Sequence, residues 1–190
     1  MEFLKKHKKV FIVAGVALLV VILACASIPI VRREIRLRSN GTYDNNFDIG
    51  DFEDAMKVVK KNYPQWAQLV EQVYRLESGN FTSTQYKQTG TAGMMVPAGA
   101  GWPFYGWSKL FFSTHPHYAP LGSVDDTNLK TLDPNWQGGK KIFVVLPSVE
   151  AGAMFLAYWL NAGNPVSSWG GGGDYANVVA QQATTIADNT

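Results

Sequence analysis

The stretch VYRLESGNFTS, residues 73–83, ends an apolar helical run in a carboxylate, a hydroxyl and a glycine. Apolar residues before and within it recur at helical spacing and form one stripe: Trp66, Leu69, Val70, Val73 and Leu76. Pro64 suits the first position of a helix, and Gly79 suits its C-terminal stop. The sequence therefore predicts a helix from Pro64 to the turn at Gly79, with one face in the core.

Glu77 lies beside this stripe rather than opposite it, because it follows Val73 by four residues. A glutamate in the last turn of a buried helix, followed at once by a chain reversal, lies at the edge of the core. There its carboxyl can face a cleft while its stem stays in apolar surroundings, which suits a general acid. An ordinary surface glutamate at a helix end is the alternative, and the residues alone leave both interpretations open.

The rest of the chain predicts a mainly α fold. Helices are expected at Asp51–Lys61, after a cap at Ser148, and after a cap at Asp174. Residues 142–146 form a short apolar run that fits a strand or an extended entry into the next helix. Between residues 81 and 138 the periodicity is lost, and short helices, one of them at residues 106–113, are expected there. Residues 170–173 are interpreted as a plain flexible connection.

The N-terminal residues predict export from the cytoplasm. Residues 10–31 are uncharged and lie between lysines and arginines, and about 20 apolar residues span a bilayer core. A retained membrane anchor over residues 1–31 is the first interpretation, followed by a linker at 32–46 and one domain at 47–190. A lipoprotein acylated at Cys25, and cleavage after the sequence Ala24-Cys25-Ala26, are the alternatives. Beyond Cys25 there is no cysteine, so the exported part forms no internal disulfide.

Charge and motif content exclude several classes of function. The net charge is +2, and much of the basic charge lies in the first 38 residues, so the remainder is mildly acidic and does not suit nucleic acid. His115 and His117 have no obvious third ligand nearby, and a zinc site normally needs four. Phosphate-binding loops and nucleophile elbows are absent from the sequence. We therefore expect neither a metal nor a cofactor.

Aromatic residues are dense in the irregular region. Trp102, Tyr105 and Trp107 lie in glycine-rich surroundings. Sugar rings have apolar faces that stack on tryptophan and tyrosine, so these residues could line subsites for a glycan. The alternative is that they form the small core of a second lobe.

Four short blocks of the chain resemble the bacterial glucosaminidases of glycoside hydrolase family seventy-three. LESGNFTS at residues 76–83 resembles the Leu-Glu-Ser-Gly motif that ends the catalytic helix of that family. TGTAGM at residues 89–94 stands where the family has Asn-Leu-Phe-Gly-Met, with Gly93 and Met94 matching. Residues 143–160 are similar to a segment in which an aromatic residue and a serine precede a glutamate and a helix. DYANVV at residues 174–179 resembles the family's Asp-Pro-x-Tyr-Ala-x-Lys-Val ending, without its proline and lysine.

This resemblance implies a fold and an activity. It implies a lysozyme-like, two-lobed domain, mainly α with a small irregular or β lobe, that cleaves β-1,4 bonds of peptidoglycan glycan strands in the cell envelope. Glu77 would be the general acid, Ser78 would orient the local structure, and Tyr175 would be a tyrosine of the cleft. Gly93 and Met94 would lie on the substrate-binding side.

A second carboxylate is less obvious than the first. Most glycosidases use two carboxyl groups, and Asp125 or Asp126 could be the partner of Glu77, although each also fits a turn. Two alternatives need no such partner: attack by the N-acetyl group of the substrate, and the route of a lytic transglycosylase, in which one glutamate is acid and then base. A non-catalytic lysozyme-like module of an envelope or phage machine is a different class, favoured by the altered Asn-Leu-Phe block. A carbohydrate-binding module built on the aromatics alone is a third.

Overall fold

The computed structural model describes residues 35–96, 107–135, 141–170 and 172–189. The chain divides at Glu34/Ile35 into two units, and all described residues belong to the second. The expected anchor or signal segment at residues 1–31, with Cys25, therefore lies outside the described residues, and so do Trp102 and Tyr105. Within the described part, no helix has the length and apolarity needed to cross a membrane.

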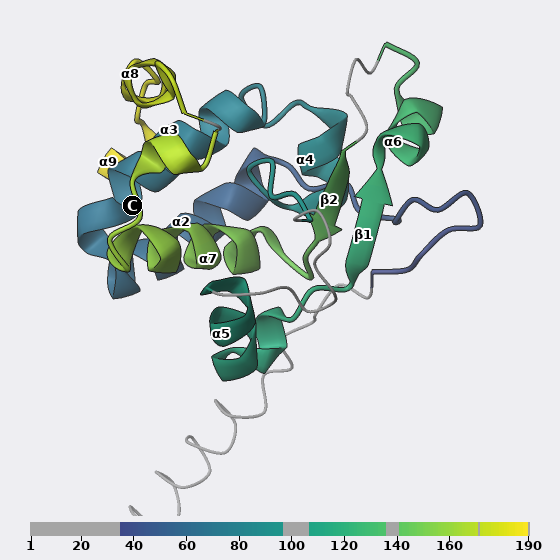
Figure 1. The fold of residues 1–190 in the computed structure, drawn as a ribbon, viewed down its shortest axis with the longest axis horizontal. Coiled ribbons are helices and arrows are strands. Elements are labelled where there is room, and N and C mark those ends of the chain that lie inside the picture. Colours follow the sequence, from purple (N-terminus) through teal and green to yellow (C-terminus); the bar gives the residue numbers. More distant parts are fainter. Residues whose placement is uncertain (1–34, 97–106, 136–140, 171, 190) are drawn as a thin grey trace, which may run out of the picture. The chain divides into compact units, whose positions relative to one another are not determined.

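The second unit is mainly helical, as predicted, and has one small sheet (Figure 1). Its α-helices are α2 (Ile49–Asn62), α3 (Ala67–Glu77), α4 (Thr84–Thr89), α5 (Trp107–Thr114), α6 (Asp126–Leu132), α7 (Val149–Asn161), α8 (Tyr175–Ala180) and α9 (Ile186–Asn189). Short 3-10 turns are η1 (Pro64–Trp66), η2 (Pro116–Tyr118) and η3 (Val166–Ser168). The strands are β1 (Gly122–Asp125) and β2 (Ile142–Val145).

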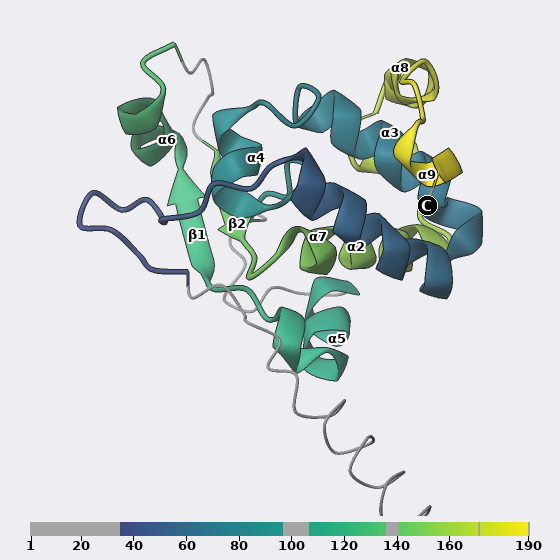
Figure 2. The ribbon, with the colours of Figure 1, turned by 180° about the vertical axis from the view of Figure 1, so that it is seen from behind.

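The main core lies between α2, α3 and α7. Helix α2 runs along α7, and α3 packs against both, as the two opposite views of the ribbon show (Figures 1 and 2). A capping box between Asp48 and Asp51 begins α2, and lysines occupy its last turn, which suits the helix dipole. The buried face of α2 consists of Phe52, Ala55, Met56 and Val59.

The sheet is an antiparallel hairpin in which Gly122 pairs with Val145 and Asp125 with Ile142. The other edge of β2 is taken up by residues 94–96, since the N–H of Val144 donates to the carbonyl of Met94 at 2.9 Å. This hairpin has its own apolar cluster, separate from the main core: Tyr43, Val124, Leu129, Phe143 and Val145. Through the backbone hydrogen bonds to β2, residues 94–96 are held on the edge of the sheet.

The structure differs from the sequence prediction in the expected linker and in the last helix. Residues 35–46, expected as part of a linker, belong to the folded unit, because Thr42, Tyr43 and Asn45 are buried and Asn45 donates to the carbonyl of Gln88. The single helix expected after Asp174 is two short helices, α8 and α9, because the chain from 181 to 185 leaves helical geometry between them.

Candidate active site

Glu77 is the last residue of α3 and is half-buried. Of the predicted apolar stripe, Val70 and Val73 are fully buried in the core, and the other members are partly buried against it: Trp66, Leu69 and Leu76. Tyr74, which the stripe did not include, is buried as well. The α-helix begins three residues later than predicted, since Pro64 opens η1 and α3 starts at Ala67. The carboxylate therefore emerges at the C-terminal end of a helix that is anchored along its whole length.

The turn after Glu77 is held in an uncommon backbone conformation. Gly79, Asn80 and Phe81 all have positive φ, of 56°, 53° and 66°. For Asn and Phe this conformation costs free energy and persists only where the surroundings enforce it. Ser78 is fully buried, and its Oγ accepts a hydrogen bond of 2.7 Å from the N–H of Phe81, whose ring lies in the core. The side chain of Ser78 thus holds this turn through the N–H of Phe81.

Tyr175 reaches Glu77 from the far end of the chain. Its hydroxyl donates a hydrogen bond of 2.7 Å to Oε1 of Glu77, and the two residues are 98 positions apart. Burial raises the pKa of Tyr175, and the hydrogen bond and negative charge of Glu77 raise it further. The phenol therefore stays protonated around neutral pH and remains a donor to the carboxylate.

Gly93 lies against the other oxygen of the same carboxylate. A Cβ built on Gly93 would come within 2.8 Å of Oε2 of Glu77, and the φ of Gly93 is +69°. Both facts require glycine at this position. Met94, the next residue, is buried in the main core and its carbonyl is bonded to β2. Of the two residues that the resemblance places on the substrate side, Gly93 thus lies against Glu77 and Met94 lies in the core.

Trp169 and Gly170 also belong to the site, although the sequence prediction missed them. The indole N–H of Trp169 donates to the carbonyl of Ala92 at 2.8 Å, next to Gly93. A Cβ on Gly170 would come within 1.9 Å of the ring of Tyr175. Trp169 thus contacts the chain next to Gly93, and Gly170, the first residue of the predicted flexible connection, lies against the ring of Tyr175. The sequence offered one signal for these two residues, because Trp169 and Gly170 come shortly before the DYANVV block.

The expected second carboxylates have structural roles in the hairpin. Asp125 caps α6, since its Oδ1 accepts the N–H of Asn128 at 2.8 Å in a capping box. Asp126 accepts the N–H of Lys141 at 2.7 Å. Asp133 similarly accepts the N–H of Asn135 at 3.0 Å. These bonds fit the turn interpretation of the acids.

The remaining predicted residues fall in three places. Trp107 begins α5, and the position of its side chain is outside what the structure describes. The ring of His115 is stacked with that of Tyr118, and the ring of His117 lies tilted against it. Among the described residues no group of three histidine, cysteine or acidic side chains lies close enough to hold a metal ion.

A second tyrosine–glutamate pair lies apart from Glu77 in the sequence. The hydroxyl of Tyr118, in η2, donates to Oε1 of Glu150 in the first turn of α7. Burial raises the pKa of Tyr118, as do its hydrogen bond to Glu150 and the charge of that residue. This pair offers a natural control for experiments on Glu77 and Tyr175.

Comparison of the chain with protein-family models, curated proteins and solved structures gives no match.

Proposed function

We propose that the protein is a peptidoglycan hydrolase of the N-acetylglucosaminidase type, with Glu77 as the general acid. The contact between Tyr175 and Glu77 supports this most directly. Two blocks that resemble the same glucosaminidase family, LESG at residues 76–79 and DYANVV at 174–179, are 98 positions apart at these two residues and yet meet side chain to side chain. If the two blocks resembled the family only by chance, nothing would lead us to expect that their side chains are in contact.

The geometry around Glu77 suggests where its proton is carried. Oε1 accepts the hydroxyl of Tyr175, so the proton of the neutral carboxylic acid belongs on Oε2. Oε2 lies against Gly93, in the space that a side chain at that position would fill. In the proposed reaction Oε2 donates this proton to the glycosidic oxygen as the bond to the anomeric carbon breaks.

The proposed reaction uses no carboxylate of the protein as nucleophile. Asp125, Asp126 and Asp133 hold backbone N–H groups in the hairpin and its turns. The N-acetyl carbonyl oxygen of the substrate then attacks the anomeric carbon, and water opens the resulting ring while Glu77, now a carboxylate, takes the proton. The alternative is a lytic transglycosylase, in which the muramyl 6-hydroxyl attacks and Glu77 is again first acid and then base.

The same proposal covers fold family and location. A main helical core and a separate hairpin cluster are what a lysozyme-like domain with a small β lobe requires. Residues 10–31 would anchor the chain in the membrane with the domain outside the cytoplasm, with a lipoprotein at Cys25 or a secreted chain as alternatives.

A non-catalytic wall-binding module is the second candidate function. The block at residues 89–92 departs from the family's Asn-Leu-Phe, and the structure uses it for a buried polar network. Thr89 and Thr91 share a 3.0 Å hydrogen bond, and Gln85 donates to both. A segment adapted to internal packing in this way favours a domain that keeps the fold without turnover.

Digestion of purified peptidoglycan sacculi tests the proposal. The full-length protein is compared with Glu77→Gln and with Glu150→Gln, a matched change at the other tyrosine-bonded glutamate. Muropeptides should be released by the unmodified protein and by Glu150→Gln, and not by Glu77→Gln. Equal release by all three, or release by none, would overturn the catalytic claim, and binding to sacculi without release would select the second candidate. Mass spectrometry separates hydrolysis, which leaves reducing ends, from transglycosylation, which leaves anhydro ends.

A further inference from the structure

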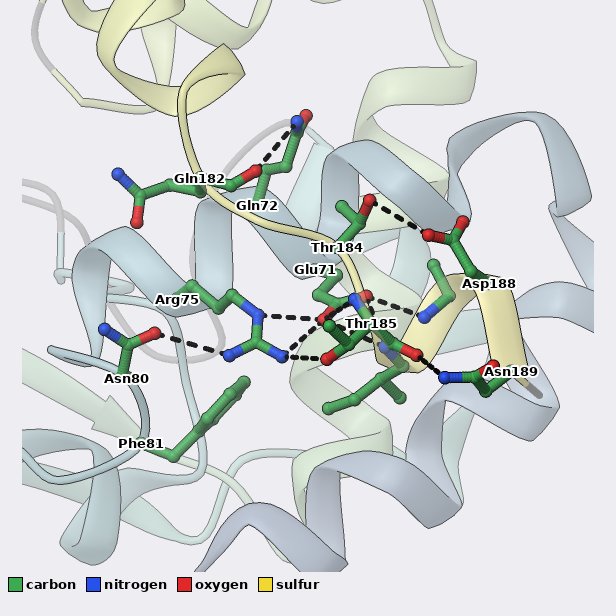
Figure 3. A network of polar contacts seen from close by, with 12 residues as sticks. Glu71, Gln72, Arg75, Asn80, Phe81, Gln182, Thr184, Thr185, Asp188 and Asn189 are labelled. Carbon is green, nitrogen blue, oxygen red and sulfur yellow. Dashed lines mark hydrogen bonds and ion pairs between the residues drawn. The ribbon is translucent and has the colours of Figure 1, made fainter.

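Glu71 is a fully buried carboxylate on the same helix as Glu77. It accepts backbone N–H groups from three consecutive residues at the start of α9: Thr185 at 3.0 Å, Ile186 at 3.1 Å and Ala187 at 2.6 Å. Arg75 pairs with it at 2.7 Å (Figure 3). The negative charge of Glu71 is therefore compensated by three N–H donors and one positive charge, as a buried carboxylate requires.

Arg75 joins three segments of the chain through one guanidinium group. Besides Glu71, it donates to Oγ1 of Thr185 at 2.8 Å and to Oδ1 of Asn80 at 3.4 Å (Figure 3). Its charge also lies 5.4 Å from the centre of the Phe81 ring. Asn80 and Phe81 are the residues with positive φ in the turn after Glu77. Arg75 thus connects this turn to residues 175–189, which we call the C-terminal segment.

Gln72 fixes the chain between the two C-terminal helices. Its Nε2 donates to the carbonyl of Ala180 at 3.4 Å and to that of Gln182 at 3.3 Å. Ala180 is the last residue of α8, and Tyr175 is the first. A helix of six residues is only about 9 Å long, so holding its end against α3 also restricts where its first residue can lie.

We propose that Glu71, Gln72 and Arg75 form a clamp that positions Tyr175 on Glu77. Helix α3 carries the clamp and Glu77, and the C-terminal segment carries the groups that the clamp holds and Tyr175. The two segments are therefore fixed to each other at two points, so the hydroxyl of Tyr175 keeps its place on Oε1. The three clamp residues are positioning residues. This inference rests on the proposed function for its importance in turnover, and on the contacts alone for its effect on Tyr175.

A purely structural role is the competing explanation. Stability alone gives little reason for a buried ion pair, since well-packed apolar residues often serve as well or better. A clamp that only closed the C-terminus would change stability without changing the contact between Tyr175 and Glu77. The test must therefore report on that contact directly and on turnover separately.

The first arm observes Tyr175 by NMR of full-length protein labelled with ¹³C at the tyrosine ζ position. The signal is assigned with Tyr175→Phe, and Glu77→Gln gives its shift without the charged acceptor. Thr185→Val removes the hydroxyl that Arg75 holds, and Thr184→Val is the matched control, because the hydroxyl of Thr184 donates to Asp188 on its own segment. The Tyr175 signal should move toward its Glu77→Gln position in Thr185→Val and in Arg75→Lys, and stay in place in Thr184→Val. If the Tyr175 signal stays in place in both Thr185→Val and Arg75→Lys, the proposal is overturned.

The second arm measures turnover of sacculi. Arg75→Lys should lower kcat about tenfold with KM unchanged, and by less than about twofold when Tyr175 is already Phe, because the clamp acts through the tyrosine. An equal loss in both backgrounds would mean a structural role and would overturn the proposal. If neither the unmodified protein nor any variant turns over glycan, the glycosidase proposal fails. The NMR experiment then still tests whether the clamp positions Tyr175.

Discussion

The hydroxyl of Tyr175 lies 2.7 Å from Oε1 of Glu77, although the two residues are 98 positions apart. The opposite face of the same carboxylate meets Gly93. One oxygen is thus held by a donor that stays protonated, and the other lies where the backbone carries no side chain. Glu150 also accepts a tyrosine hydroxyl, that of Tyr118, so this second pair serves as a control for the pair of Glu77 and Tyr175.

Replacing Tyr175 with Phe should lower kcat by about 10- to 100-fold, because the donor that orients the carboxylate is lost. The free energy of unfolding should fall by about 1.5–3 kcal/mol, the usual contribution of a hydrogen bond to a charged group. Rates of muropeptide release and urea unfolding measure the two effects. Tyr118→Phe should have a similar effect on stability and leave kcat within about twofold. A Tyr175→Phe protein with unchanged kcat would show that the contact has no part in turnover.

Replacing Gly93 with Ala should displace the carboxylate of Glu77, because the new Cβ would lie 2.8 Å from Oε2. It also places a side chain at a φ of +69°, which costs about 1 kcal/mol. Gly163→Ala is the matched control, because its φ is +87° and nothing lies within 4 Å of its Cβ. Both variants should lose stability in thermal unfolding, and only Gly93→Ala should lose more than about tenfold in kcat. Equal kcat in the two variants would contradict the steric argument.

The sequence could predict those features of the site that depend on helical periodicity or on neighbouring residues. The stripe through Val70 and Val73 predicted α3, and the position of Glu77 at its end followed from spacing. The pairing of Glu77 with Tyr175 has no periodicity behind it, and only the resemblance of both blocks to one family placed the two residues in one site. The geometry of their contact comes from the packing of α3 against α8.

Other elements could not be predicted because tertiary contacts create them. Helix α4 has the sequence TQYKQT, without an apolar stripe, and it forms because Ser83 caps it and Tyr86 is buried in the core. Residues 35–46 are polar in sequence and fold because Asn45 exchanges hydrogen bonds with Gln88. Glu71 gave no signal, since a buried carboxylate within a helix has the same local sequence as an exposed one.

Replacing Trp169 with Phe should weaken the link between the tyrosine segment and Gly93. The indole N–H that donates to the carbonyl of Ala92 is lost, while most of the ring packing is kept. We expect a loss of about 1 kcal/mol in stability and about threefold in kcat. Trp66→Phe is the control, because its indole N–H donates to Asn161 at the end of α7. A loss of kcat in Trp66→Phe as large as in Trp169→Phe would mean that the effect is general.

Replacing Glu71 with Gln should make stability less dependent on pH. Burial raises the pKa of Glu71, but hydrogen bonds from Ala187, Thr185 and Ile186, with that of Arg75, outweigh it, so the pKa is lowered from 4.5. A lowered pKa in the folded state stabilises the protein above the unfolded-state value, and this contribution is lost as the pH falls through the native pKa.

Urea unfolding from pH 7 down to pH 3 measures this contribution. At pH 7 the variant should be less stable by about 3 kcal/mol, because the bond network loses its charge and Arg75 loses its partner. The difference should shrink as the pH falls below the ordinary glutamate pKa of 4.5, because the unmodified protein then has to protonate Glu71 against its hydrogen bonds. Asp54→Asn, at an exposed pair with Lys57, should show no comparable change with pH. A constant difference between pH 7 and pH 3 would mean that Glu71 stabilises the C-terminal segment by packing rather than by its charge.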